Sequence, residues 1–182
     1  MRRIAIAGAL AAGLVLAGVP TGLASSGTFS DPRGDLDPPA ASNSANYDIV
    51  RATEGHASKG RLVHTVSVAG SIADPARAEP PRLYIEDTAS DAPNGQAQCR
   101  YFVGRFEGRL GVFTCGYGDR VGSARITRTS SRTVRYVFSA RAIGNPAAYR
   151  WAALTNGPTT GTTSLLDRIP SGDNAFFTHE LR

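Results

Sequence analysis

From residue 47 onward the chain is built of short segments in which apolar and polar residues alternate. Each segment is rich in Val, Ile, Thr, Tyr and Phe and is bounded by clusters of Gly, Pro, Asn, Asp and Ser, which is typical of half-buried strands. No segment keeps an apolar period of 3.6 residues over three helical turns. The pattern predicts strands at 48–54, 61–70, 81–87, 99–106, 110–116, 121–128, 133–139, 148–155 and 176–181, and one helical turn at 141–145.

Many short strands without long helices predict an all-β fold, a two-sheet antiparallel β-sandwich of jelly-roll or immunoglobulin-like layout. We expect residues 47–182 to form this one domain. Residues 25–46 are a leader rich in Pro, Ser, Ala and Asn, in which we expect order only around the turn at 31–35. The Thr/Gly-rich stretch 156–164 is predicted to be a loop.

The predicted hairpin at 121–139 shows the alternation clearly. Pairing Ala124 with Tyr136 gives one continuous apolar face. The same register places Arg125 opposite Arg135 on the outer face, where like charges repel. Two interpretations follow: solvent and nearby carboxylates offset the repulsion, or the arginines form a basic strip that binds an anionic polymer at the cell surface.

Residues 1–24 have the three parts of a secretory signal peptide. A basic start precedes an apolar run over residues 4–19, which is too short to span a bilayer comfortably. Gly22-Leu23-Ala24 then offers small residues for cleavage after Ala24. We expect Sec-type export to the cell envelope or the medium, with no stable membrane insertion after the signal is removed.

Cys99 and Cys115 are the only cysteines. An even number of cysteines in an exported protein predicts a disulfide, here across the hairpin of strands 99–106 and 110–116. A register in which the two cysteines face each other also pairs Tyr101 with Phe113. A metal-binding or reactive pair would need closer spacing and histidine partners.

Charge and motifs exclude several classes of function. The formal charge of +5 includes two arginines of the signal, so the mature chain is too weakly basic to predict a nucleic-acid partner. No nucleophile elbow, His-Glu-x-x-His or phosphate-binding loop occurs. Glu54, Glu86 and Glu107 could supply the pair of carboxylates that a glycosidase needs. Nothing in the sequence places any two of them at the separation that such a pair requires. We therefore predict that the protein is not an enzyme. His64 shares a face with Leu62, which favours a core or rim position.

The N-terminal part carries the motif Asp31-Pro32-Arg33-Gly34-Asp35, a Pro-rich loop, and then Tyr47-Asp48-Ile49. In this order the stretch resembles the start of DOMON-like sandwiches related to family 9 carbohydrate-binding modules and to the C-terminal module of glucodextranase. The segment 61–68 also resembles their second strand. The resemblance implies an exported, non-catalytic β-sandwich that binds carbohydrate or another cell-envelope polymer. The alternative is an exported structural or protein-interaction domain with no small ligand.

The motif concentrates carboxylates. Asp31, Asp35 and Asp37 lie close together in sequence, and Asp48 returns at the next strand. Oxygen ligands of this kind can hold calcium, and the resemblance implies a structural calcium ion. The other interpretation is a tight turn in which the carboxylates accept backbone N–H groups. Both remain open at this stage.

Modules of this kind bind sugars through exposed aromatic rings. Tyr84 and the Tyr117 of a Gly-Tyr-Gly-Asp turn are the candidate exposed rings. Trp151 is a third candidate, but its alternation with Tyr149 and Ala153 also fits a strand that faces the core. The candidate ligand-binding residues are therefore Tyr84, Tyr117, Trp151, Arg125 and Arg135.

Overall fold

The computed structural model describes residues 26–36, 43–57, 60–87, 99–158, 163–171 and 175–181. The predicted signal peptide, residues 1–24, lies outside the described residues, and so does Asp37. Within the described part the fold is all-β, and the prediction of a two-sheet antiparallel sandwich is confirmed.

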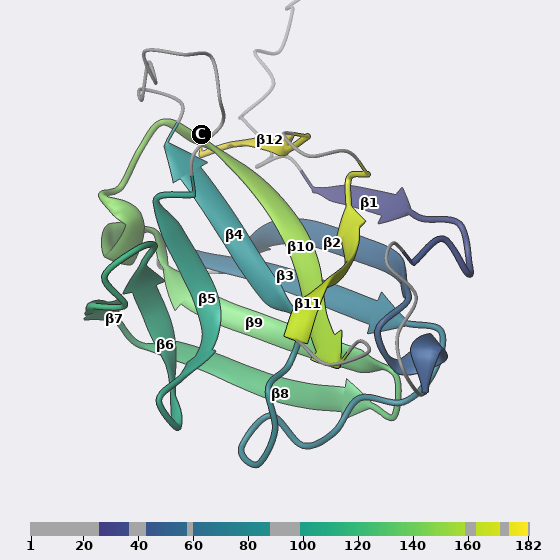
Figure 1. The fold of residues 1–182 in the computed structure, drawn as a ribbon. Helices are drawn as coiled ribbons and strands as arrows, with labels where there is room; N and C mark the ends of the chain where they lie inside the picture. The colour runs from purple at the N-terminus through teal and green to yellow at the C-terminus, as the bar shows by residue number, and fades with distance from the viewer. Residues whose placement is uncertain are drawn as a thin grey trace, which may run out of the picture.

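Two sheets form the sandwich (Figure 1). The five-stranded sheet contains, in spatial order, β1 (Gly27–Ser30), β2 (Ile49–Ala57), β3 (Arg61–Val68), β9 (Thr133–Ser139) and β8 (Ala124–Ser130). The seven-stranded sheet contains β11 (Thr163–Ile169), β10 (Ala148–Pro158), β4 (Arg82–Asp87), β5 (Tyr101–Phe106), β6 (Arg109–Thr114) and β7 (Arg120–Gly122), and β12 (Phe177–Glu180) also pairs with β10. Short 3-10 helices occupy Ser44–Asn46 (η1) and Ala140–Ile143 (η2).

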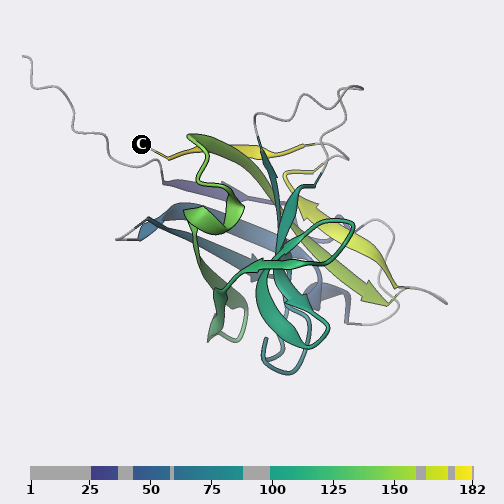
Figure 2. The same ribbon diagram turned by 90° about the vertical axis from the view of Figure 1, so that its left-hand side faces the viewer.

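The core lies between the two sheets, whose strands cross obliquely (Figures 1 and 2). Alternation along β3 explains how one face is chosen, because Leu62, His64 and Val66 are buried while the residues between them are partly exposed. On the opposite sheet Tyr149 and Trp151 point inward from β10 in the same way. Large apolar side chains from both layers are thus removed from water together.

Two strands occur where the sequence predicts none. β1 lies inside the predicted leader, and it is held by pairing with β2 and by Phe29, whose ring stacks on Phe177 at a centroid distance of 3.6 Å. Figures 1 and 2 show β1 and β12 at the same end of the sandwich. β11 overlaps the predicted loop and pairs with residues 153–158 of β10, on both sides of a register shift between Thr155 and Asn156. β1 has Phe29 as its single large apolar residue, and in β11 the adjacent Leu165 and Leu166 are followed by Asp167 and Arg168, which breaks the alternation. Tertiary pairing therefore decides the structure of both segments.

The hairpin of β5 and β6 has a register one residue away from the predicted one. Glu107 and Gly108 both have positive φ, of 47° and 78°, so they form a two-residue turn that closes the pair Phe106 and Arg109. Phe102 consequently lies opposite Phe113. Because a shift of one residue reverses the faces of one strand relative to the other, these two rings share the outer face of the sheet.

The hairpin of β8 and β9 differs from its prediction by two residues. Ile126 pairs with Tyr136, and Arg135 lies opposite Thr127, not opposite Arg125. A bulge between Arg128 and Ser130 accompanies this shift. A shift of two residues leaves every side chain on the same face of the sheet, so the prediction of the apolar face is correct. The prediction that Arg125 lies directly opposite Arg135 is wrong.

The predicted disulfide between Cys99 and Cys115 is confirmed, with a Cα–Cα distance of 5.8 Å. It joins the chain just before β5 to the chain just after β6, and it is compatible with an oxidising compartment. Among the described residues there is no helix of the length and apolarity that crossing a membrane would require.

Candidate functional site

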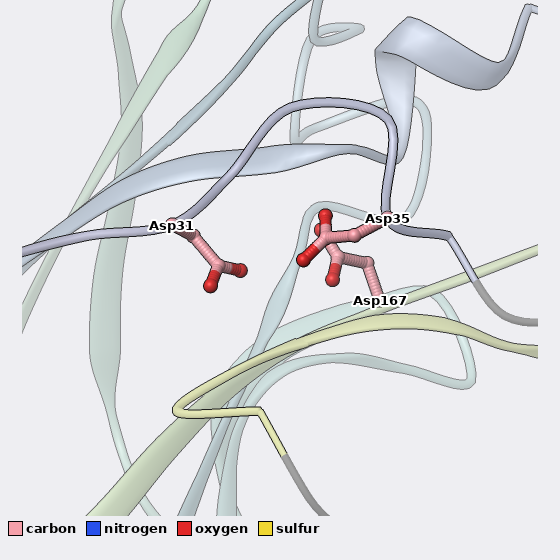
Figure 3. Close-up of side chains that lie close together, drawn as sticks. All are labelled: Asp31, Asp35 and Asp167. Carbon is pink, nitrogen blue, oxygen red and sulfur yellow. The ribbon is translucent and has the colours of Figure 1, made fainter.

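Three carboxylates converge at the end of the sandwich where β1 leads into the Asp31–Asp35 turn. Asp31 follows β1, Asp35 ends the turn, and Asp167 lies on β11. One oxygen from each lies within 4.8 Å of the others. Figure 3 shows the carboxylate of Asp31 directed toward those of Asp35 and Asp167. Chain segments far apart in sequence therefore form one acidic cluster, which we define as Asp31, Asp35 and Asp167.

Backbone amides fix the surroundings of the acidic cluster. Asp48 Oδ2 accepts a hydrogen bond of 2.9 Å from the amide of Gly34, whose positive φ of 78° lets the turn close. Asp167 accepts hydrogen bonds from the amides of Ile49 at 2.5 Å and of Arg168 at 2.7 Å. The interpretation of the motif as a turn held by carboxylates is correct for Asp48, and Asp167 adds a link from β11 to the start of β2.

When all three carboxylates of the acidic cluster are ionised, burial and their mutual repulsion destabilise the charged form. Burial, and then the neighbouring carboxylate of Asp35, raise the pKa of Asp31 to about 6. Burial raises the pKa of Asp167 to about 7, although two amides donate to it. Among the described side chains, Asp31 Oδ2 and Asp48 Oδ1 are buried without a hydrogen-bond partner. Oxygen donors, crowded negative charge and an orphaned oxygen together fit a calcium ion.

The structure brings together two of the four predicted calcium ligands. Asp31 and Asp35 come together, whereas Asp48 lies beside the turn and outside the group of three. The local sequence gives only a weak signal for Asp167. Its neighbours Leu166 and Ile169 indicate a buried segment, in which a carboxylate needs partners.

A second candidate site lies on the outer face of the seven-stranded sheet. Phe102, Phe106 and Phe113 pack there as a triangle, with ring centroids 5.2 to 5.9 Å apart. The register of the β5–β6 hairpin puts them on this face. Tyr84 extends the row, because it lies opposite Phe102 on the neighbouring strand β4. The outer face of this sheet is thus aromatic where the predicted register would have placed the rings on both faces.

A pocket of about 240 Å³ opens at this aromatic face, and we call it the aromatic pocket. Its walls include Arg82, Tyr84, Cys99, Phe102, Phe106, Thr114, Cys115, Gly116, Tyr117 and Gly118. Tyr117 is 89% exposed and stands between two glycines with positive φ. The guanidinium of Arg82 lies over the ring of Phe102, 5.1 Å from its centroid. The structure therefore brings together Tyr84 and Tyr117, two of the predicted ligand-binding rings.

The other predicted candidates lie elsewhere. Trp151 is 0% exposed and packs between the sheets, so its prediction as a ligand-binding ring is wrong and the alternative of a core residue is correct. The reason is strand alternation, which turns it inward with Tyr149. Arg125 and Arg135 line a groove with Arg61 on the five-stranded sheet, away from the tyrosines.

A larger pocket, of about 500 Å³, lies near η1 and the chain before β4. Several of its polar groups already hold loops in place. Asn46 Oδ1 accepts from the amide of Ser71 at 2.7 Å, and Arg128 donates to the carbonyl of Ile72 at 3.1 Å. Tyr47 is its one aromatic wall residue. We therefore regard the aromatic pocket, with its several rings, as the better candidate for a ligand site.

Comparison of the chain with protein-family models, with curated proteins and with solved structures finds no significant match.

Proposed function

We propose that this protein is an exported, non-catalytic carbohydrate-binding module that holds one sugar unit of a cell-envelope polysaccharide in the aromatic pocket. The observation that carries the proposal is the meeting of Tyr84 and Tyr117 at one pocket. The resemblance of residues 31–49 to DOMON-like and family 9 carbohydrate-binding modules favours the same class of function.

The chemistry of the aromatic pocket suits a sugar. Tyrosine rings offer apolar surface to the C–H faces of a pyranose and a hydroxyl to its rim. Arg82 and Thr114 supply hydrogen-bonding groups beside the rings. The volume of about 240 Å³ is smaller than that of a pocket enclosing a drug-sized molecule. It therefore suits one unit of a chain whose neighbours continue past the rim.

We propose a separate, structural role for the acidic cluster. A calcium ion held by Asp31, Asp35 and Asp167 would neutralise their repulsion and tie the turn after β1 to β11. The acidic cluster and the aromatic pocket share no residue. The ion would accordingly stabilise the fold without taking part in sugar binding.

Affinity electrophoresis and pull-down against a panel of soluble and insoluble polysaccharides and wall extracts test the proposed function. We expect saturable binding to at least one neutral polysaccharide and a loss of at least tenfold in affinity in Tyr117→Ala. Tyr117→Phe is the matched control and should retain most of the binding, because it keeps the ring. Absence of saturable binding across the panel, or undiminished binding in Tyr117→Ala, would refute the proposal.

A further inference from the structure

The outer face of the five-stranded sheet carries positive charge and, at the strand positions that the structure describes, no negative charge. Its outward positions are occupied by Thr, Ser, Gly, Val and Arg along the described parts of β1, β2, β3, β9 and β8. Four exposed arginines stand on it: Arg51, Arg61, Arg125 and Arg135. We call this surface the arginine face. No aspartate or glutamate is found at an outward position of these described strands.

The strand register places the four arginines in successive outward rows of the sheet. Arg51 lies in the row of Ser67, and the next outward row contains Arg135 beside Thr65. Arg125 occupies the third row, opposite Val137, and Arg61 the fourth, opposite Ser139. Successive rows are two residues apart, which is about 7 Å along a strand. The arginine face therefore presents one cation per row over four consecutive rows.

These guanidiniums have no acidic partner within the described part of the chain. The basic partners in the ion pairs observed there are Arg82, Arg150 and His179, none of which belongs to the arginine face. Neighbouring hydroxyls are satisfied by each other: Thr53 and Thr65 are 2.6 Å apart through their Oγ1 atoms, and Ser67 and Thr133 are 2.9 Å apart. The guanidinium donors thus stay available to an external acceptor.

Three of the arginines share a concave surface. Arg61, Arg125 and Arg135 line one groove of about 550 Å³, with Ser123 and Ser139 at its sides. Planar guanidinium groups bind phosphate and carboxylate oxygens through two parallel hydrogen bonds. Solvent alone would accommodate these charges, but it would not explain four like charges on a face whose described outward positions hold no acidic residue. Charge complementarity points to a ligand with anions repeated along an extended chain.

We propose that the arginine face is a second binding surface, for an anionic cell-envelope polysaccharide that carries phosphate or carboxylate groups. This surface lies on the opposite sheet from the aromatic pocket, so the inference goes beyond the proposed sugar site and does not depend on it. A protein with both surfaces can hold a neutral sugar on one side and a polyanion on the other.

The test is a binding titration of the full mature chain with three soluble polymers: a glycerol-phosphate teichoic acid, polygalacturonate and neutral dextran. The first two distinguish phosphate from carboxylate as the recognised anion. We expect saturable binding to one or both and none to dextran at this face. Affinity should fall as salt rises, because bound polyanions release counterions. Arg125→Gln/Arg135→Gln should weaken binding roughly tenfold.

The matched control is Arg77→Gln/Arg109→Gln, which removes the same charge at two exposed positions outside the arginine face. It should retain binding within about twofold of the parent. Equal weakening in both double variants, or no binding to either polyanion, would overturn the proposal. Tighter binding to anionic phosphatidylglycerol vesicles or to a DNA duplex than to both polymers would overturn the assigned ligand class.

The two surfaces can be separated experimentally. Tyr117→Ala should leave polyanion binding unchanged, since Tyr117 lies at the aromatic pocket. Arg125→Gln/Arg135→Gln should leave neutral-sugar binding unchanged. All three substitutions are at exposed positions, so circular dichroism and thermal unfolding should report a folded protein in every case. If no binding is found at one surface, binding at the other can still be tested.

Discussion

The indole Nε1 of Trp151 donates a hydrogen bond to the carboxylate of Glu54, and the bond crosses from one sheet to the other. The same carboxylate lies 3.2 Å from Nδ1 of His179 on β12. Nearby, His64 Nε2 and the hydroxyl of Tyr149 make a second cross-sheet hydrogen bond of 2.7 Å. The sandwich is thus held together by specific polar contacts inside an apolar core.

We predict that Glu54→Ala lowers the free energy of unfolding by about 3 kcal/mol, because it leaves two buried donors without their acceptor. Glu54→Gln should cost clearly less, since its amide oxygen can still accept from Trp151. Urea unfolding followed by tryptophan fluorescence measures both. A loss below about 1 kcal/mol in Glu54→Ala would show that the contact has little effect on stability.

Calcium is predicted to stabilise the fold through the acidic cluster. At about 100 times the dissociation constant, the ion should raise the melting temperature by roughly 5–10 °C. Asp35→Ala should abolish the rise, whereas Asp119→Ala, at an exposed carboxylate outside the cluster, should keep it. Scanning calorimetry with calcium and with chelator measures the effect. Identical melting curves under the two conditions would exclude a calcium site.

Without metal, stability should fall as pH rises from 5 to 8. The folded pKa values of Asp31 and Asp167, about 6 and about 7, lie above the unfolded value near 3.9. The folded state therefore binds more protons across this range, and stability is lost as pH rises through the folded pKa values. Urea midpoints in chelator at pH 5 and pH 8 measure the slope. Asp167→Asn should reduce it, and a flat or rising profile in the parent would contradict the assignment.

The disulfide should stabilise both the fold and the aromatic pocket. Closing a loop with a sequence separation of 16 contributes about 3 kcal/mol by restricting the unfolded chain. Cys99→Ser/Cys115→Ser should lose that amount in urea unfolding. It should also weaken sugar binding, because both cysteines line the pocket beside Tyr117. Full retention of sugar affinity in the folded double variant would show that the bridge does not shape the site.

Much of the fold follows from local pattern. β3 and β9 alternate strictly between buried and exposed side chains, so their positions and faces are readable from the sequence. β1 and β11 are not readable in this way, because β1 has one large apolar residue and β11 lacks strict alternation. Both form through pairing, with β2 and β10 respectively. The turn at Glu107 and Gly108 could have given the correct register, since two residues of positive φ close a two-residue hairpin.

The candidate sites are predictable only in part, because they too depend on pairing between strands that are distant in the sequence. Asp31 and Asp35 belong to one motif and can be found together in the sequence. Asp167 joins them only through the pairing of β11 with β10, and a local pattern cannot indicate that. Tyr84 and Tyr117 are both predicted from the sequence as exposed rings, and in the structure Tyr117 is exposed whereas Tyr84 is half-buried. Their meeting depends on the order of β4, β5 and β6 in the sheet.

The most direct test of the proposed function is an amide NMR titration of the mature protein with an oligosaccharide from the polymer that it retains best. We predict saturable shift changes that cluster at Arg82–Tyr84 and at residues 114–118, two of the segments that line the aromatic pocket. Changes centred instead on Tyr47 and Arg128, at the larger pocket, or no saturable change with any oligosaccharide, would contradict the account.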